Sequence, residues 1–369
     1  MNSLESKKIL IVTKFFYPEI TPRAFRAFEL AKEFARQGHN VKVLTTNKNY
    51  DYKALEVKYG FKIEDTVANE PNELVGGGLI RLIRFGLKHF FLFPFIYLSK
   101  YFKKALKKET GYDILISIAY PYTVHFGVAL ATDKNKELAK VWIADCGDPF
   151  TGGQETRFES PFYYKWIEKW FCKKPHFITI PIKEAKSAYP SICQHKLKVI
   201  PQGFDFSTIK PNFKPGENKV ITFAYAGTLS AGSRDPRSLI DYLQSLNKDF
   251  KFILYTRNKD FLEVYKKQLG DKLELRDYVP RDILLRDLGK MDFLVNLENK
   301  TSIHSPSKLI DYALLERPIL SVKPFDLDTE IVDEFMTANY KNSLIVENIE
   351  NYNITNVANN FLALYNQDM

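Results

Sequence analysis

The sequence predicts an α/β protein built from two doubly wound units. Its 369 residues exceed the size at which a single hydrophobic core usually stops growing, so two domains are expected. A content of 45% hydrophobic and 26% charged residues is typical of a globular chain that buries a core. Short apolar, β-branched and aromatic runs also alternate with helical patterns, which indicates α/β layering.

The first series of expected strands occupies the N-terminal half. The runs are nearly continuous in apolar residues, as expected for parallel strands that helices cover on both faces. They are KILIV from Lys8, HNVKVLTT from His39, DILISI from Asp113, KVWIAD from Lys140, FITIPI from Phe177 and LKVIPQG from Leu197.

A polar stretch, FDFSTIKPNFKPGENK, follows Gly203 and is typical of a linker between domains. The predicted domains are therefore 1–205 and 218–348, and a helical pattern over 349–369 could pack on either of them. We expect a ligand in the cleft between the domains, at the carboxyl ends of the strands. The second series of expected strands is VITFAYAG from Val220, FKFILYT from Phe250, LELRDYV from Leu273, DFLVNLE from Asp292, PILSV from Pro318 and SLIVE from Ser343.

A formal net charge of +9 suggests a polyanionic partner, either nucleic acid or an anionic membrane. Much of the charge lies at 81–108, RLIRFGLKHFFLFPFIYLSKYFKKALKK, where cations flank an apolar run that Pro94 interrupts. That run is too short to span a bilayer and suits the headgroup region of an anionic leaflet. The alternative is a core helix with a solvated basic face. Nucleic-acid binding is disfavoured, because these cations form no recognisable nucleic-acid module.

The N-terminus is polar, and the apolar run at 9–12 is too short for the core of a signal peptide. We therefore expect a cytoplasmic protein, peripheral on the inner face of the cytoplasmic membrane. Cys146, Cys172 and Cys193 are odd in number and have neither metal-site nor redox-motif spacing, which predicts reduced thiols.

Three helices are expected to begin with a capping residue followed by proline, a favourable start because proline lacks the amide that would otherwise be unpaired. Nearby cations would make these helix starts binding sites for phosphate oxygens, and a diphosphate is the expected ligand. The alternative is that the cations only solvate exposed helix starts. The three starts are Thr21-Pro22 with Arg23 and Arg26, Asp235-Pro236 with Arg234 and Arg237, and Ser305-Pro306 with Lys308 and the neighbouring cleft candidate His304.

Asp311 and Lys308 share a face of the third helix. A carboxylate in that place can accept hydrogen bonds from ribose hydroxyls, as acidic residues do in dinucleotide folds. The alternative is a surface ion pair between the two side chains. Gly227, after the strand ITFAYA, would let a phosphate approach the backbone closely, although a plain turn is the commoner role of such a glycine.

In the first domain, Asp145 and Asp148 follow an expected strand in WIADCGDPF. Carboxylates at that edge can orient a sugar hydroxyl or act as a base, and the alternative is helix capping and turn formation. His125 could contact a ligand bound at this edge, or be a buried histidine with satisfied hydrogen bonds.

These segments together resemble glycosyltransferase family 4, whose members are retaining enzymes of the GT-B architecture. The resemblance spans nearly the whole chain. It is carried by KILIVTKFFYPEITPRAFRAFELAKEFARQGHNVKVLT, YDILISIAYPYTVHFGVALA, KVWIADCGDPF, KVIPQGFD, ITFAYAGTL and SPSKLIDYALLERPIL.

The resemblance implies two Rossmann-like domains facing a central cleft, with the acceptor on the first and a nucleotide-sugar donor on the second. It implies no metal and no cofactor, with the donor diphosphate held by Arg234, Lys308 and the amides of the Ser305 helix. The predicted catalytic groups are Asp145, Asp148, Arg234 and Lys308. The predicted donor-binding residues are Gly227, Thr228, Arg234, His304, Ser305, Pro306, Ser307, Lys308 and Asp311, and the predicted acceptor or cleft residues are Tyr17, Arg23, Arg26 and His125.

The sequence also departs from the family pattern. Of two glutamates eight residues apart, the first is replaced by Ile303 and the second is shortened to Asp311. Paired glycines of the first loop are Thr21 and Pro22 here, and a histidine common after the fourth strand aligns near Gly147.

The predicted function is transfer of a sugar to a glycan or lipid-linked acceptor in the synthesis of a bacterial surface polysaccharide, such as lipopolysaccharide, capsule or O-antigen. Two alternatives are a non-catalytic nucleotide-binding scaffold of the same fold and a sugar-nucleotide epimerase.

Overall fold

The computed structural model describes residues 5–46, 50–66, 76–92, 94–151, 160–208, 218–229, 234–257, 259–298 and 308–368. The chain forms two compact units, one from residues 1–204 with 351–369 and the other from 205–350. Each unit contains one parallel sheet and is described by itself.

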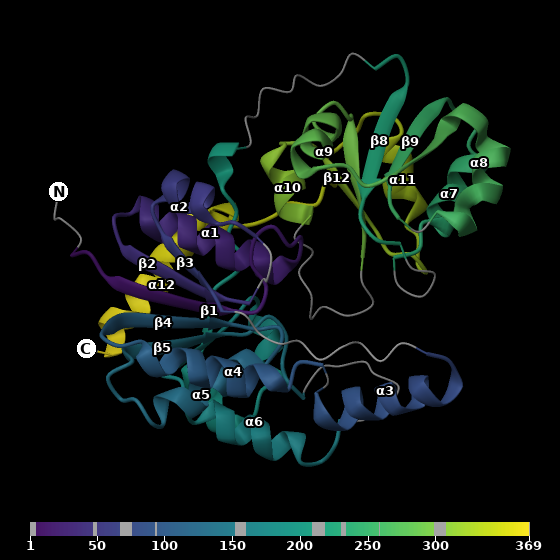
Figure 1. The fold of residues 1–369 in the computed structure, drawn as a ribbon. Helices are drawn as coiled ribbons and strands as arrows, with labels where there is room; N and C mark the ends of the chain where they lie inside the picture. The colour runs from purple at the N-terminus through teal and green to yellow at the C-terminus, as the bar shows by residue number, and fades with distance from the viewer. Residues whose placement is uncertain are drawn as a thin grey trace. The chain divides into compact units, whose positions relative to one another are not determined.

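The larger unit has a seven-stranded sheet in the order β3-β2-β1-β4-β5-β6-β7 (Figure 1). Neighbouring strands pair in parallel, with Ile9 opposite Val41 on one side of β1 and opposite Ile114 on the other. The chain therefore reverses direction across the sheet between β1 and β4, which is where Rossmann-like sheets open a crevice for ligands. The strands are β1 (Lys8–Thr13), β2 (Asn40–Thr45), β3 (Lys62–Asp65), β4 (Tyr112–Ile118), β5 (Ala139–Asp145), β6 (Phe177–Ile180) and β7 (Leu197–Val199).

Helices cover both faces of this sheet, because alternate strand residues point to opposite sides. Ile9 and Ile11 of β1 pack in one core with α1 and α12, whereas Leu10 and Val12 pack in a second core with α4, α5 and α6. Figure 1 shows α12, in yellow, close to α1. The helices are α1 (Pro22–Arg36), α2 (Lys53–Tyr59), α3 (Gly78–Phe91), α4 (Tyr97–Ala105), α5 (Thr123–Thr132), α6 (Tyr164–Cys172) and α12 (Ile354–Asp368).

The basic segment 81–108 forms two helices with different surroundings. Leu98 and Phe102 of α4 are fully buried, so α4 is a core helix with a solvated basic face. Helix α3 has no buried residue, and its Leu79 and Leu82 are 71% and 68% exposed. Within the described residues, the helices are too short or too polar to cross a membrane.

The smaller unit has a five-stranded parallel sheet in the order β10-β9-β8-β11-β12, which reverses between β8 and β11. Phe223 and Tyr225 of β8 face a core shared with α7 and α11, and Ala224 and Ala226 face a core shared with α9 and α10. The elements are β8 (Ile221–Ala226), α7 (Arg237–Ser245), β9 (Phe250–Tyr255), α8 (Glu263–Leu269), β10 (Leu273–Arg276), α9 (Arg281–Leu288), β11 (Phe293–Leu297), α10 (Lys308–Leu314), β12 (Ile319–Val322) and α11 (Thr329–Phe335).

Two strand expectations need correction. The run SLIVE at 343–347 forms no strand: Leu344 donates one backbone hydrogen bond to Ile319, but Ile345 is 79% exposed. Strand β3 was not expected, because its sequence KIED is polar and it lies at the edge of the sheet. The other expected strands are present.

Candidate functional site

In the smaller unit, Gly227 follows β8 at the point where the strand order reverses. Its φ of 151° is rare for L side chains, and a Cβ there would lie 3.0 Å from the Tyr225 hydroxyl oxygen. That hydroxyl donates to the Thr228 carbonyl at 3.1 Å, and the Thr228 Oγ1 lies 3.2 Å from the Tyr278 hydroxyl. Glycine is therefore needed to bring the chain back over the Tyr225 ring.

Lys308, the first residue of α10, places its Nζ 4.1 Å from the centre of the Tyr225 ring. This nitrogen is buried and has no hydrogen-bond partner among the described residues. Burial, and then the nearby charge of Arg234, lower the pKa of Lys308 well below its ordinary value. Burial raises the pKa of Tyr225, and the nearby charge of Arg234 opposes that shift.

Lys308 and Arg234 thus converge on one tyrosine at the reversal point of the sheet. A buried ammonium is costly unless an opposite charge compensates it. An anion placed between the two cations would supply that charge and accept their hydrogen bonds. The arrangement suits a phosphate or a diphosphate group.

Asp311 lies one turn further along α10 and pairs with Arg281 of α9, not with Lys308. The expected alternative of a Lys308–Asp311 ion pair is therefore not formed. Burial raises the pKa of Asp311, and Arg281 opposes that shift. Tyr312, the next residue, is buried, and its hydroxyl accepts a hydrogen bond from the Ala226 amide at 3.0 Å, which ties α10 to the end of β8.

Part of the predicted site falls outside the described residues: His304, Ser305, Pro306 and Ser307, together with Ile303. Asp235 is described and is buried before α7. Its carboxylate accepts from the Arg237 amide at 3.0 Å and pairs with the Arg237 guanidinium at 2.6 Å. Arg237 is thus held by its own helix start.

In the larger unit, Asp145 ends β5 and forms a buried ion pair with Arg26 of α1. Each residue is 2% exposed; Arg26 donates to the two carboxylate oxygens at 2.8 and 3.1 Å, and Thr179 donates at 2.7 Å. Burial alone would raise the pKa of Asp145, but Arg26, Arg23 and Thr179 hold it below its ordinary value. This carboxylate is engaged within the protein, and the geometry suits a structural role better than contact with a substrate.

Arg23 and its helix start lie beside this ion pair. The Thr21-Pro22 start is confirmed, because the Thr21 hydroxyl accepts from the Ala24 amide. The Arg23 guanidinium is 3.7 Å from Asp145 and lies against Gly147, where an added Cβ would meet it at 2.4 Å. Arg23 is partly exposed and remains available to a ligand at this edge.

Two other predicted residues of the larger unit differ in burial. His125 is fully buried, with Nδ1 2.8 Å from the Ser117 hydroxyl and its ring stacked on Phe171, and burial lowers its pKa to about 3. This is the alternative of a buried histidine with satisfied hydrogen bonds. Tyr17 is 38% exposed, and its ring stacks on Phe28.

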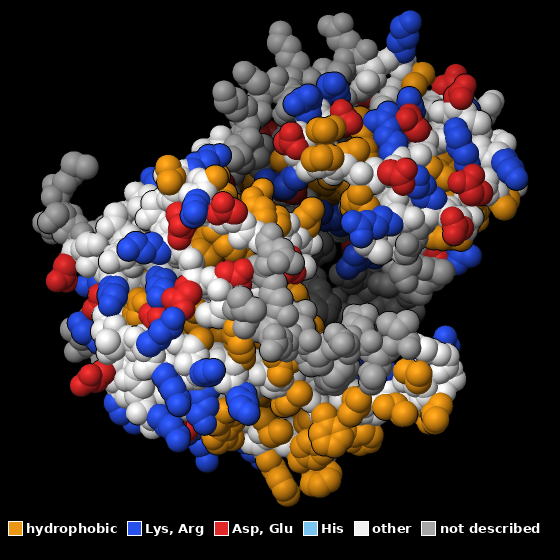
Figure 2. All heavy atoms as spheres, in the orientation of Figure 1, with side chains coloured by type: hydrophobic (Ala, Val, Ile, Leu, Met, Phe, Trp, Pro, Cys, Tyr) orange, Lys and Arg blue, Asp and Glu red, His pale blue; other side chains and the backbone are white. Residues whose placement is uncertain are grey.

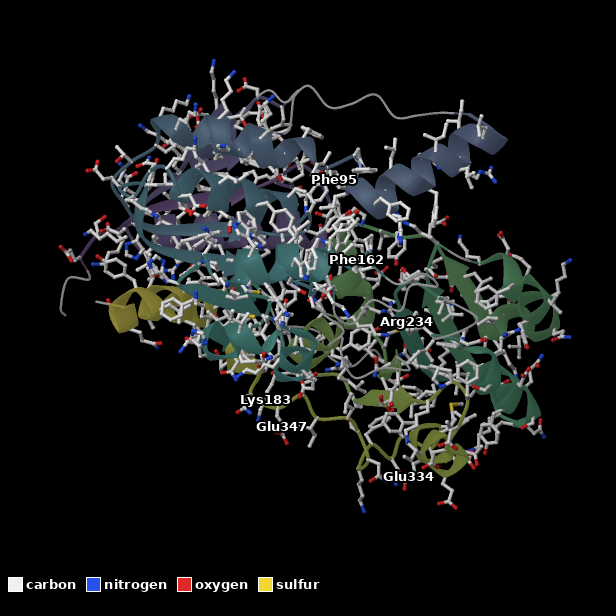
Figure 3. All side chains as sticks on the ribbon, turned by 90° about the horizontal axis from the view of Figure 1, so that it is seen from below. Phe95, Phe162, Lys183, Arg234, Glu334 and Glu347 are labelled. Atoms are coloured by element: carbon white, nitrogen blue, oxygen red, sulfur yellow. The ribbon has the colours of Figure 1, made fainter. Side chains whose placement is uncertain are left out.

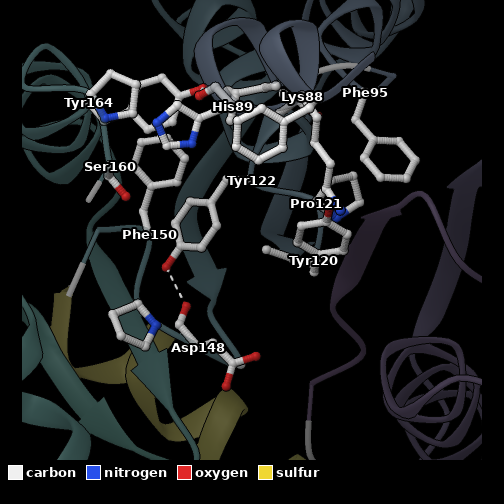
Figure 4. A pocket seen from close by; sticks show the side chains of 17 residues that line it. Lys88, His89, Phe95, Tyr120, Pro121, Tyr122, Asp148, Phe150, Ser160 and Tyr164 are labelled. Atoms are coloured by element: carbon white, nitrogen blue, oxygen red, sulfur yellow. Dashed lines mark hydrogen bonds between the residues drawn. The ribbon is translucent and has the colours of Figure 1, made fainter. Parts of the chain in front are cut away.

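A pocket of about 380 Å³ opens at the carboxyl ends of β4 and β5, under α3 (Figure 4). Its walls are mainly aromatic and proline side chains, including Phe95, Tyr120, Tyr122 and Phe150. Asp148 is exposed at this edge, and its carbonyl accepts a hydrogen bond from the Tyr122 hydroxyl at 2.7 Å. The two predicted aspartates therefore have different surroundings: Asp145 is buried in an ion pair, and Asp148 lines a pocket.

Sequence reasoning missed several side chains that shape these sites. Tyr225 and Tyr312 hold Lys308 and α10, Arg281 pairs with Asp311, and Tyr120 and Tyr122 line the pocket. The available signal was position: the tyrosines at 120, 122 and 225 lie near the carboxyl ends of strands, where ligands bind in such sheets.

No family model matches the sequence. No curated protein matches it either. Solved structures do match its fold: a glycosyltransferase from Rickettsia africae aligns with a TM-score of 0.66 at 13% identity, covering 98% of each chain. The lipopolysaccharide outer core galactosyltransferase WaaB aligns at 0.62 and 13% identity, covering 98% of this chain and 100% of its own. Anabaena HepE in complex with UDP and glucose aligns at 0.56 and 13% identity, covering 98% of each.

The chain therefore has the α/β architecture of the GT-B glycosyltransferases, with two parallel sheets of Rossmann-like order. The predicted fold class is confirmed. At such identities the likeness concerns the fold, and the activity has to be argued from the sites.

Proposed function

We propose that the chain is a retaining glycosyltransferase of family 4 that transfers a sugar from a nucleoside-diphosphate sugar to a lipid-linked acceptor. The observation that carries the proposal is the position of the buried Lys308 Nζ over the Tyr225 ring, with the charge of Arg234 close to both residues. It lies at the crevice where open α/β sheets bind nucleotides. Structures that share the fold include a protein bound to UDP and glucose, which agrees with a nucleotide-sugar donor.

In this proposal the diphosphate of the donor lies between Lys308 and Arg234, and Gly227 lets it approach the end of β8. Asp311 accepts hydrogen bonds from the ribose hydroxyls, with Arg281 positioning its carboxylate. Thr228, and His304 to Ser307 outside the described residues, complete the predicted donor site. The two cations stabilise the charge that develops on the departing diphosphate, so no metal is required.

In the transfer step, the protein needs only to orient the acceptor hydroxyl. The bond between the anomeric carbon and the donor phosphate oxygen breaks, and a bond to an acceptor hydroxyl oxygen forms on the same face. The acceptor proton passes to the departing diphosphate. Of the two predicted aspartates, Asp148 is the exposed one, and we assign it to orient that hydroxyl.

A membrane-bound acceptor is favoured by the surface around α3. We define the aromatic surface as Leu82, Phe90 and Phe91 of α3 with Phe162 and Trp166 at the start of α6, which are between 48% and 71% exposed. The Tyr164 hydroxyl donates to the His89 carbonyl at 2.9 Å, so the two helices meet. Figure 2 shows hydrophobic side chains gathered over this region, and Figure 3 shows Phe162 near the end of α3.

Exposed apolar area of this kind usually marks a contact with a membrane or a protein. Arg81, Arg84 and Lys88 lie on the same helix and would attract anionic headgroups. We therefore propose a protein peripheral on the inner face of the cytoplasmic membrane. Its proposed role is in the synthesis of a bacterial surface polysaccharide, such as lipopolysaccharide, capsule or O-antigen.

The donor half of the proposal is tested by thermal unfolding with a panel of UDP-, ADP-, GDP- and dTDP-sugars. A bound donor should raise the unfolding temperature by mass action, and Arg234→Ala should abolish the rise. Labelled donor is then incubated with bacterial membranes, and label is expected in the organic-extractable fraction. Donor binding without any transfer would indicate a nucleotide-binding scaffold, and label only in a converted nucleotide sugar would indicate an epimerase.

The membrane half is tested by flotation with anionic vesicles. Phe162→Ala and Trp166→Ala should weaken binding, because both remove exposed aromatic area. Phe325→Ala, which changes a 61% exposed phenylalanine of the other unit, is the matched control and should bind as wild type does. Equal binding by all of these proteins would contradict a membrane role for the aromatic surface.

A further inference from the structure

The pocket under α3 is not explained by the donor site or by the aromatic surface. Its volume of about 380 Å³ lies within the range of small-molecule sites, about 300–1,000 Å³. Three kinds of side chain follow one another along it: Lys88 and His89 on α3, aromatic rings in the middle, and the carboxylate of Asp148 at the far end (Figure 4).

The end of the pocket at α3 is formed by the cation Lys88 and the imidazole of His89. Helix α3 is fastened at this point, because the Tyr164 and Tyr163 hydroxyls donate to the carbonyls of His89 and Phe90. These bonds hold the backbone of α3 in place, and the side chains of Lys88 and His89 line the pocket there. Phosphate oxygens are the natural partner of a lysine ammonium beside an imidazole N–H donor.

The middle of the pocket is aromatic. Tyr120 is 51% exposed and meets Phe95 edge to face, with ring centres 5.4 Å apart. Tyr122 and Phe150 lie together on the floor, with centres 5.0 Å apart. Flat apolar rings with few polar atoms suit the C–H face of a sugar ring, which stacks on them while its hydroxyls point outward.

The far end is polar again. Figure 4 shows the Asp148 carboxylate at the opposite end of the pocket from Lys88 and His89. The Tyr122 hydroxyl binds the Asp148 carbonyl and so holds the residue in place. A carboxylate here would repel a phosphate and accept a hydrogen bond from a sugar hydroxyl. A sugar phosphate would therefore bind with its phosphate at the α3 end and a hydroxyl at the Asp148 end.

We infer that this pocket binds the sugar-phosphate part of the acceptor, with the sugar ring on the aromatic walls, a hydroxyl toward Asp148 and the phosphate on Lys88 and His89. The lipid then leaves the pocket along α3, where the exposed apolar side chains lie. The inference rests on the proposed function, since it assumes a lipid-linked acceptor. It narrows the acceptor to a glycosyl phosphate, as opposed to a glycan without phosphate.

The test compares two charge reversals on one helix, Lys88→Glu and Arg84→Glu. Both change the charge of α3 equally, but only Lys88 lines the pocket. With labelled donor and acceptor-containing membranes, Lys88→Glu should raise the KM for acceptor at least about tenfold, the cost of losing one charge-assisted hydrogen bond. Arg84→Glu should raise it no more than about threefold, and the donor KM should stay unchanged in both.

Flotation with anionic vesicles separates the phosphate of the acceptor from the headgroups of the bilayer. Both charge reversals should weaken vesicle binding to the same extent. A further variant completes the test: Ser160→Trp should fill the pocket and raise the KM for acceptor with normal vesicle binding.

The outcomes distinguish the inference from the function beneath it. Absence of labelled lipid with the wild-type protein would overturn the proposed function, and the inference with it. Transfer by the wild type with equal acceptor KM for Lys88→Glu and Arg84→Glu, or a normal KM for Ser160→Trp, would overturn the pocket inference alone.

Discussion

Each unit holds a buried cation near the carboxyl edge of its sheet, and the two cations differ in their partners. Arg26 is paired with Asp145, supported by Thr179 and by the backbone carbonyl of Ile200. The Lys308 nitrogen has no hydrogen-bond partner among the described residues and lies beside the like charge of Arg234. A buried charge that the protein itself compensates is part of the structure, whereas one that it leaves uncompensated is prepared for a ligand.

The largest expected effect is the loss of stability in Arg26→Met. The variant leaves the Asp145 carboxylate buried without its cation, which should lower the free energy of unfolding by about 3–5 kcal/mol. Urea unfolding measures this change. Lys174→Met in the same unit removes the partner of Asp133, an exposed carboxylate, and should cost no more than about 1 kcal/mol. Comparable losses in the two variants would mean that burial of the Arg26–Asp145 pair has little energetic consequence.

Lys308→Met should behave in the opposite way. It removes an uncompensated charge, so the free energy of unfolding should stay the same or rise by about 1 kcal/mol. The affinity for the nucleoside diphosphate should fall about 10- to 100-fold, because a charge-assisted hydrogen bond is lost. Urea unfolding and titration calorimetry measure the two effects on one protein. A variant that is destabilised but binds the nucleoside diphosphate normally would show that Lys308 has a structural role and does not bind the ligand.

A smaller effect is expected for Asp311→Asn, which tests whether the carboxylate contacts the ribose. The affinity for the nucleoside diphosphate should fall about tenfold, because the neutral amide is a weaker acceptor of ribose hydrogen bonds. Affinity for pyrophosphate, which has no ribose, should stay within about twofold of wild type. Titration with both ligands provides the comparison, and an equal loss for pyrophosphate would place Asp311 at the phosphates.

The smallest effect is expected on removal of divalent metal. If Lys308 and Arg234 neutralise the diphosphate, excess EDTA should leave the rate of sugar transfer within about twofold of the untreated enzyme. The control adds magnesium back after chelation. Transfer that EDTA abolishes and magnesium restores would show that the two cations do not suffice.

Much of the fold could be predicted from the sequence, because buried parallel strands leave a clear apolar pattern. All but one of the expected strands are present, and the single strand that was missed, β3, is polar and lies at the sheet edge. The run SLIVE was wrongly expected to be a strand, because a short apolar run does not reveal whether neighbouring strands cover it.

The sites could be predicted only in part. Local pattern singled out Lys308, Arg234 and Asp148 as candidates, but could not show that Asp145 meets Arg26, a residue 119 positions away. It also could not separate α3 from α4 within the basic segment, because both have similar composition and only tertiary packing buries Phe102. The pocket under α3 combines side chains from segments far apart in the chain, so no single motif indicates it.

The uncompensated charge of Lys308 can be tested directly by the protons taken up when the diphosphate binds. Burial and Arg234 lower the pKa of Lys308 below its ordinary value of 10.5, and a bound anion should raise it again. Between these two pKa values binding should therefore take up protons, and affinity should weaken as the pH rises.

The measurement is titration calorimetry at about pH 8–9, where the diphosphate is already fully ionised, in buffers of different ionisation enthalpy. The ligand is the nucleoside diphosphate of the most stabilising donor. Wild type should take up protons, and Lys308→Met should take up none. Identical proton uptake by the two proteins, or binding of equal strength, would contradict the assignment of Lys308 as the cation that holds the donor diphosphate.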